Sequence, residues 1–154
     1  MGYRRGFERF GGQIVTAADP LDSTVAAEVD VASFDTGLEA FNRHLLAGDF
    51  FDVANYPTAT LSSTAIRPAG DRFHLDADLT LRGITKAVTF ELEVLGFGFG
   101  VNGETKAGFS ASATVNRGDF GIAFQSVLAN GNLAVSDEAR ILLEIEAVLR
   151  ADQA

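Results

Sequence analysis

Most of the chain alternates between apolar and polar residues, which is the pattern of a β-strand with one buried face. In residues 85–95, Phe90 and Leu92 fall on one side of the predicted strand, and Thr89 and Glu91 fall on the other. The same alternation recurs in residues 24–33, 72–82, 106–116 and 138–149, and more weakly in residues 7–17 and 58–67. These segments predict an all-β protein built from antiparallel strands.

One segment follows helical spacing instead. Its apolar residues are Leu38, Phe41, Leu45 and Leu46. Thr36 and Glu39 have the spacing of a capping box, in which each side chain accepts a hydrogen bond from the other residue's backbone N–H. Gly48 is expected to end the helix in the left-handed conformation. The sequence therefore predicts one short helix between two strands, and a weaker helical turn in residues 123–129.

Long strands with one nearly uncharged face favour a closed up-and-down barrel, because closure removes the strand edges. The predicted inner face is rich in alanine: Ala27, Ala65, Ala77, Ala107, Ala111, Ala113 and Ala147. If all of these point inward, the barrel is under-filled, and a long apolar ligand would relieve the cost of the empty volume. The alternative is that the larger residues interdigitate with the alanines and fill the interior.

Composition narrows the possible partners. The 154 residues, expected to form a single domain over 1–154, carry 12 Lys and Arg against 21 Asp and Glu, a net charge of −9. This charge disfavours nucleic acid and anionic lipid surfaces as partners. No stretch approaches a membrane span, so we expect no stable membrane insertion. The opening MGYRRGFERFGG lacks the apolar run of a signal peptide. We expect a cytoplasmic protein, or a periplasmic one if an upstream segment is missing.

Candidate catalytic and metal-binding groups are sparse. There is no cysteine, and His44 and His74 lie far apart with no acidic residue at ligand spacing, so we expect no metal site. Asp49, Asp52 and Asp119 could pair for acid–base chemistry, but no nucleophile motif accompanies them. Turn capping is the favoured role for these carboxylates.

Glycine-rich segments have structural interpretations. Arg82-Gly83 and residues 116–119 fit turns tied by hydrogen bonds between arginine and aspartate. The run GFGFG at residues 96–100 resembles a nucleotide loop, but no helix follows it. We expect a flexible hairpin loop in which Phe97 and Phe99 stand at the mouth of the barrel.

Four runs carry a family resemblance: VASFDTG, HL followed by DFFDVANYP, LTLRGITKAV, and GFSASATVNRGDFGI. In this order and spacing the chain resembles the YceI-like family of polyisoprenoid-binding proteins, from about Arg5 to Leu149. The resemblance implies a lipocalin-like antiparallel β-barrel with an elongated apolar pocket for a long isoprenoid or fatty chain. It also implies frequent homodimers, no catalysis and no cofactor beyond the bound lipid.

Two departures from the family pattern affect these expectations. Phe41 and Asn42 stand where relatives carry an Arg-Asp pair, so any polar link made by that pair is lost or altered. Relatives also begin with a further strand upstream of the segment matching YRRGFERFGGQI. Either the gene start is placed too late, or this member has seven strands and a gap in the barrel wall.

We therefore expect a non-enzymatic protein that binds or carries a long apolar lipid and forms a homodimer. Alternation and the family's fold together give nine candidate lipid-binding residues: Val29, Val31, Phe34, Leu61, Phe73, Leu75, Phe90, Phe109 and Leu143. One alternative is an enzyme of isoprenoid or fatty-acid metabolism that uses the barrel as a substrate tunnel. It would need a buried polar group, for which Ser33 and Ser63 are the inward candidates. Another is a filled barrel that acts as a dimeric stress-response protein.

Overall fold

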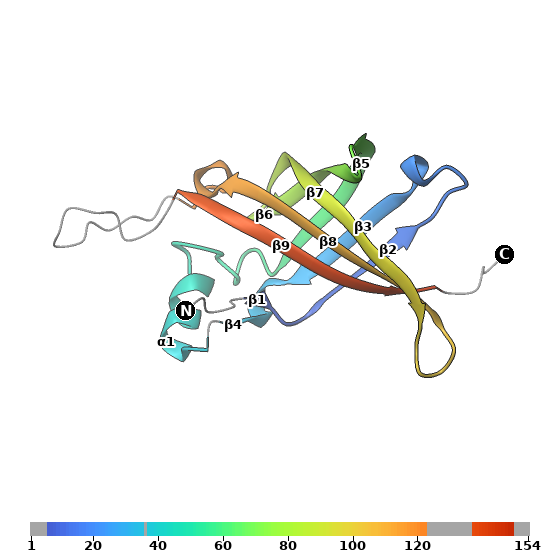
Figure 1. Cartoon of the computed structure of the whole chain (residues 1–154). Helices are drawn as coiled ribbons and strands as arrows, with labels where there is room; N and C mark the ends of the chain where they lie inside the picture. Colours follow the sequence, from blue (N-terminus) through green and yellow to red (C-terminus); the bar gives the residue numbers. More distant parts are fainter. Residues whose placement is uncertain (1–5, 36, 123–136, 150–154) are drawn as a thin grey trace, which may run out of the picture.

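A computed structural model describes residues 6–35, 37–122 and 137–149. Seven strands form one antiparallel sheet that curls into a half-barrel (Figure 1). In spatial order they are β2 (Phe10–Val15), β3 (Thr24–Asp30), β5 (Thr58–Ala69), β6 (Arg72–Leu81), β7 (Ile84–Phe99), β8 (Thr105–Asn116) and β9 (Glu138–Val148). All seven strand predictions are confirmed, and the all-β, lipocalin-like fold class with them.

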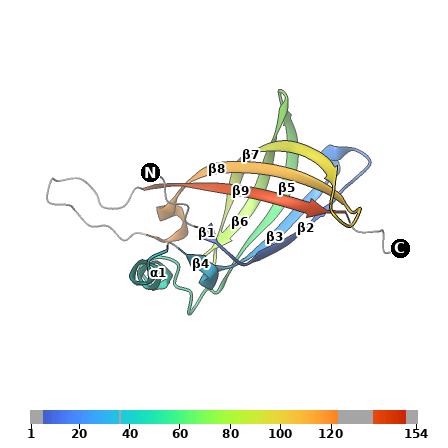
Figure 2. The same ribbon diagram turned by 60° about the horizontal axis from the view of Figure 1, so that its bottom comes forward.

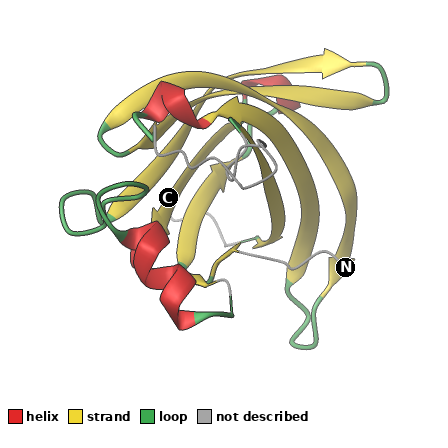
Figure 3. Ribbon diagram, turned by 90° about the vertical axis from the view of Figure 1, so that its left-hand side faces the viewer, coloured by secondary structure: helices red, strands yellow, loops and turns green. Residues whose placement is uncertain are grey.

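The half-barrel is open along one side. Strands β2 and β9 lie at the two ends of the strand order, and no pairing joins them within the described residues. Figure 3 shows the curl of the sheet and the space that it partly encloses. The alternation alone favours a closed barrel, whereas the described strands form an open sheet of seven.

Short elements gather near one end of the half-barrel (Figure 2). Strands β1 (Gly6–Phe7) and β4 (Phe34–Asp35) form a separate two-stranded ribbon, and α1 (Glu39–Leu46) follows it. The 3₁₀ turns η2 (Val31–Ser33) and η3 (Arg117–Phe120) continue β3 and β8. Away from these elements, the turn η1 (Pro20–Asp22) connects β2 to β3.

The helix is present, but both of its predicted ends are wrong. It begins at Glu39 after Leu38, so Glu39 is its first residue and not the third, as a capping box requires. Leu38 makes no side-chain capping bond. The C-cap is Ala47 in an extended conformation, and Gly48 does not have positive φ. The reason is that the chain turns at once into a tight loop, in which Phe50 and Asp52 donate backbone N–H bonds to the Ala47 carbonyl.

Asn42, the second of the two residues that replace the Arg-Asp pair of the resembled family, makes a polar contact. Its Nδ2 donates to Asp35 Oδ1 at 3.0 Å, and the same oxygen accepts from the Gly37 N–H at 2.8 Å. Asparagine therefore links α1 to the end of β4. The helical turn predicted in residues 123–129 lies outside the described residues.

A β-bulge in β5 corrects one inward assignment. Leu61 pairs with Leu79 and Ser63 with Ala77, but Ala65 then pairs with Asp76. The extra residue shifts the alternation by one, because side chains switch faces at every position along a strand. Ala65 is therefore on the outer face and exposed, and Ile66 takes the inward position opposite Leu75.

The GFGFG run is also not the loop that the sequence suggests. Strand β7 continues to Phe99, so Gly96, Phe97, Gly98 and Phe99 all pair with β8. A second bulge between Val94 and Gly96 accommodates this run. The hairpin turn lies further on, where the Gly100 N–H donates to the Glu104 carbonyl at 2.8 Å.

A candidate binding surface on the concave face

The core of the protein lies on the concave face of the sheet. Its buried residues are Leu61, Leu75, Ala77, Phe90, Ala111 and Ala113. Cross-strand pairing fixes this arrangement, because directly opposed residues of an antiparallel pair share one face. Phe90 lies opposite Leu75, and Leu143 lies opposite Ala111. These pairs extend one apolar surface across neighbouring strands.

Seven of the nine predicted lipid-binding residues share this concave face. Leu61, Leu75 and Phe90 are buried in its centre, and Leu143 packs against them. Their cross-strand partners place the other three, Val29, Phe73 and Phe109, on the same face. These three, like Leu143, are only partly buried, so the four are the accessible members of the set.

The other two predicted residues lie off the sheet. Val31 is in η2 and is buried to 1% exposure. Phe34 is in β4, where its ring packs against Phe7 and Phe51 at centroid distances of 4.9 and 5.3 Å. The alternation of β3 ends at Asp30, where the chain turns into η2. Periodicity could not place residues beyond that turn.

The concave face continues onto exposed apolar side chains at the end of the sheet away from α1. Val94 pairs with Phe109, Phe97 pairs with Ala107, and all four share the concave face. Phe97 and Phe99 are 78% and 84% exposed. Elsewhere on the concave face, Phe10 of the edge strand β2 pairs with Val29 and is 57% exposed. The nine predicted residues omit Val94, Phe97 and Phe10, although the first continues the visible alternation of its strand.

The two serines considered for catalysis are held by the backbone. Ser63 Oγ accepts from the Val25 N–H at 2.8 Å. Ser33 Oγ accepts from the Arg9 N–H at 2.9 Å and donates to the Asp30 carbonyl at 2.6 Å. Among the described residues, no buried side-chain polar atom lacks a hydrogen-bond partner. The two serine hydroxyls therefore serve the protein's own structure.

Most charged residues of the strands lie on the convex face, whereas Lys86, opposite Leu79, is on the concave register. Arg67 donates two hydrogen bonds to Asp76, at 2.6 and 2.9 Å, and Thr89 donates a third at 2.7 Å. The bonds from Arg67, and after them the bond from Thr89, lower the pKa of Asp76 to about 2. Lys106 contacts Glu146 at 2.7 Å on the same face. The sheet thus separates an apolar concave surface from a charged convex one.

The remaining candidates have structural contacts. His44 stacks edge-on against Phe50, with ring centroids 5.0 Å apart. Arg82 donates to the Gly121 carbonyl at 2.6 Å, and Arg117 donates to the Ile122 carbonyl at 2.8 Å. The ion-pair partner of Arg117 is Asp137, at 3.6 Å. Both arginines tie turns together, and both do so through backbone carbonyl groups.

Asp52 Oδ1 and Oδ2 accept from Asn55 Nδ2 at 3.1 Å, a local contact within the loop after α1. No three His, Asp or Glu side chains in the described ranges come together as a metal site. In those ranges, too, no helix has the length and apolar character to cross a membrane.

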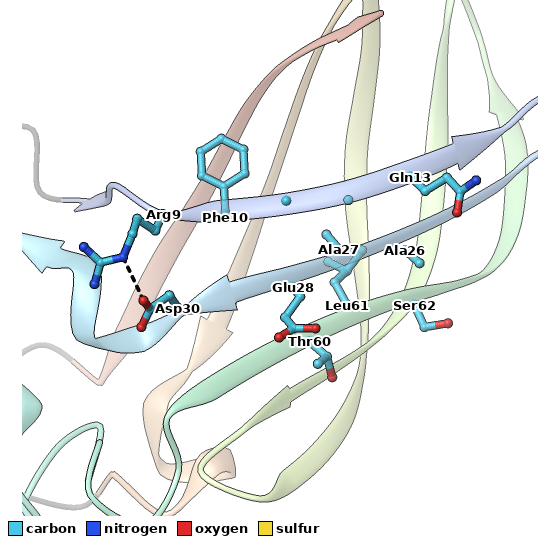
Figure 4. A pocket seen from close by; sticks show the side chains of 12 residues that line it. Arg9, Phe10, Gln13, Ala26, Ala27, Glu28, Asp30, Thr60, Leu61 and Ser62 are labelled. Carbon is cyan, nitrogen blue, oxygen red and sulfur yellow. Dashed lines mark hydrogen bonds and ion pairs between the residues drawn. The ribbon is translucent and has the colours of Figure 1, made fainter. Parts of the chain in front are cut away.

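A shallow hollow lies beside the β2 edge (Figure 4). It encloses about 740 Å³ and is open to solvent. Phe10, Ala27 and Leu61 contribute apolar surface, whereas Glu28 and the Arg9–Asp30 ion pair lie along its rim (Figure 4). It has no convergent set of catalytic groups among its lining residues.

Solved structures share this architecture. The crystal structure of a Campylobacter jejuni YceI protein superposes with a TM-score of 0.81 at 22% identity, covering 98% of this chain and 87% of that one. Burkholderia cenocepacia BcnA gives a TM-score of 0.78 at 28% identity, covering 92% and 85%.

Sequence relatives agree with the structural ones. A UPF0312 protein of Pseudomonas aeruginosa is 34% identical over 152 residues, which cover 96% of this chain and 76% of the relative. Protein YceI of Escherichia coli O157:H7 is 36% identical over 104 residues, which cover 68% of this chain and 54% of the relative. A family model described as the YceI-like domain matches residues 2–147. The chain therefore belongs to the YceI-like family.

Proposed function

We propose that the concave face binds a long apolar chain, an isoprenoid or a similar lipid, without chemical conversion. The observation that carries this proposal is the continuity of one apolar surface. It runs from the buried centre at Phe90 and Leu75, through partly buried Phe109, to exposed Phe97 at the end of the sheet. A surface of this form matches an elongated ligand better than a compact one.

Binding of such a chain would be driven by removal of apolar area from water, worth roughly 25 cal/mol per Å². Specificity would be loose, since one methylene more or less changes the binding free energy by only about 1–3 kcal/mol. The protein would then select its ligands by length and apolar character. No hydrogen-bonding group is required for that selection.

The enzymatic alternative finds less support. A substrate tunnel needs a polar group that is aimed at the substrate and free to react. Ser63 and Ser33 are already bonded to backbone groups. The filled-barrel alternative also finds less support, because Val29, Phe73 and Phe109 on the concave face are only partly buried. A filled interior would cover such side chains.

The same architecture supports a homodimer. Strands β2 and β9 each have one neighbour in the described sheet, and a strand edge readily pairs with another chain. On β9, Leu142 and Val148 add exposed apolar surface, at 53% and 51%. We expect light scattering to give a dimer that persists across micromolar concentrations. A monomer throughout that range would contradict the edge-pairing model.

The lipid-binding proposal can be tested with a fluorescent polyene fatty acid. Titration into detergent-free protein should give saturable binding, and an added polyprenol should displace the probe. Phe109→Ser should weaken binding by about tenfold, because it removes a large apolar contact from the accessible part of the surface. Circular dichroism should show that this partly buried position tolerates the change.

The matched control is Leu142→Ser. Leu142 is on β9, the strand next to Phe109, but it lies on the convex face opposite Ser112. It should leave probe affinity unchanged. No saturable binding to the wild-type protein, or equal losses in both variants, would contradict a ligand site on the concave face.

A further inference from the structure

The β7–β8 hairpin ends in an uncharged apolar projection. Residues 94–103, here called the hairpin tip, contain no Asp, Glu, Lys or Arg, although the whole chain carries 33 such residues as 12 basic and 21 acidic. Leu95, Phe97, Phe99 and Val101 are 62%, 78%, 84% and 98% exposed. Figure 1 shows the hairpin extending clear of the other strands, at the end of the molecule away from α1.

The two faces of this ribbon differ. Phe97 and Phe99 pair with Ala107 and Thr105, which places both rings on the concave face. On the convex face, Lys106 lies opposite Gly98 and contacts Glu146 at 2.7 Å and Glu104 at 3.6 Å. The hairpin is therefore an amphipathic ribbon, apolar on the side that continues the candidate binding surface and polar on the other.

The turn that presents Val101 is ordered by its own side chains. Glu104 Oε2 accepts from the Asn102 N–H at 3.0 Å. The Glu104 carboxylate also packs directly against Gly100, in the space that a Cβ there would occupy. These contacts keep the turn closed while Val101 points into solvent. The exposure of the tip is therefore a feature of a defined turn.

We propose that the hairpin tip docks onto the surface of a neutral lipid bilayer. The purpose of this docking, exchange of an apolar chain with the membrane, rests on the proposed function. A projecting ribbon with two phenylalanines on one face can enter the boundary between headgroups and acyl chains. The absence of charge suits zwitterionic lipid, and the net charge of −9 opposes anionic lipid.

A second protein is a poorer match for the tip. Stable protein interfaces bury about 20–30 residues on each side, whereas the tip offers four large apolar side chains on a narrow projection. A bilayer needs no matching groove. Docking through Phe97 and Phe99 would also bring the concave face against the membrane, so that an apolar chain could move between the two without crossing water.

The test uses vesicles of phosphatidylcholine alone and needs no bound ligand. Wild-type protein should co-sediment with the vesicles, and addition of phosphatidylserine should weaken the binding. The double variant Phe97→Ser/Phe99→Ser should lower the vesicle partition coefficient by about tenfold or more, since both rings lose their apolar contact. Leu38→Ser is the control, because Leu38 is 60% exposed and directly precedes α1, which lies at the opposite end of the molecule.

The outcomes are distinguishable. Wild-type protein that stays in solution, or a double variant that sediments like wild type, would overturn the docking proposal. A dimer that becomes a monomer in the double variant would make the tip an interface between copies and would also overturn it. Probe binding in vesicle-free solution tests the proposed function separately. Val101→Ser, which changes only the turn, should retain that binding and lower vesicle co-sedimentation, whereas the double variant should lower both, because Phe97 also belongs to the concave surface.

Discussion

Phe90 lies directly opposite Leu75 across strands β6 and β7, and the two side chains are 0% and 3% exposed. One residue further along, Glu91 lies opposite His74 on the convex face. This single step divides the apolar interior from the charged exterior. The register of β7 therefore decides which side chains can form a ligand site.

Replacing Phe90 with aspartate should unfold or strongly destabilise the protein. The change removes a buried ring, which costs about 3–5 kcal/mol, and places an unpaired carboxylate in the core. A typical total stability is only about 5–15 kcal/mol. Urea unfolding followed by circular dichroism measures the effect. Glu91→Ala is the control and should change stability little, and equal losses would mean that the register is shifted by one residue.

Ser63→Ala should lower stability by about 1 kcal/mol and leave ligand affinity unchanged. The β3–β5 pairing ends at Ala26 and Ser62, and the next N–H, that of Val25, donates to the Ser63 hydroxyl. Removal of one hydrogen-bond partner costs on that order. Chemical unfolding and probe titration measure the two quantities. Turnover of a lipid by the wild-type protein that Ser63→Ala abolishes, with no loss of stability, would instead support the enzymatic alternative.

Gly83→Ala should destabilise the protein more than Gly70→Ala. Both glycines have positive φ, at 70° and 67°, so each alanine variant pays about 1 kcal/mol of backbone strain. At Gly83 a Cβ would also meet the Tyr56 ring at 2.7 Å, whereas Gly70 has open space around it. The Tyr56 contact should add about 1 kcal/mol or more. Equal thermal midpoints for the two variants would contradict this contact.

Stability should fall as the pH is lowered from 4 towards 2, in part because of Asp76. Its folded-state pKa of about 2 lies below the ordinary value of 3.8. A lowered folded-state pKa stabilises the protein above the unfolded-state pKa, and this contribution is lost as pH falls through the folded-state value. Asp76→Asn should therefore flatten the decline in the thermal midpoint over this range. An unchanged acid slope would show that the Arg67 and Thr89 contacts have no role in it.

The sequence predicts the sheet well because one alternating pattern determines both burial and register. It fails where a single extra residue changes the phase. Ala65 is apolar and fits the period, but the bulge after Ser63 moves it outward. Gly96 and Gly98 suggest a loop, yet both lie in a strand whose own bulge takes up the irregularity. Bulges depend on the partner strand, so one strand's pattern does not reveal them.

The candidate site was predictable to the same extent. Phe73, Phe90 and Phe109 follow from period two and lie on one face, as expected. Phe34 does not, because the chain leaves the sheet after Asp30 and its ring joins Phe7 and Phe51. The helix ends were also missed. The helix begins after Leu38 without a side-chain cap, and the loop after Ala47 donates backbone N–H groups to the last carbonyls of the helix in place of the expected glycine stop.

Native mass spectrometry of protein purified without detergent, before and after incubation with a polyprenol, tests the central claim most directly. A ligand on the concave face should add the mass of one lipid per chain. The adduct should persist in Leu142→Ser and be depleted in Phe109→Ser. Bare chains under all conditions, with no uptake of the added polyprenol, would contradict the lipid-binding account.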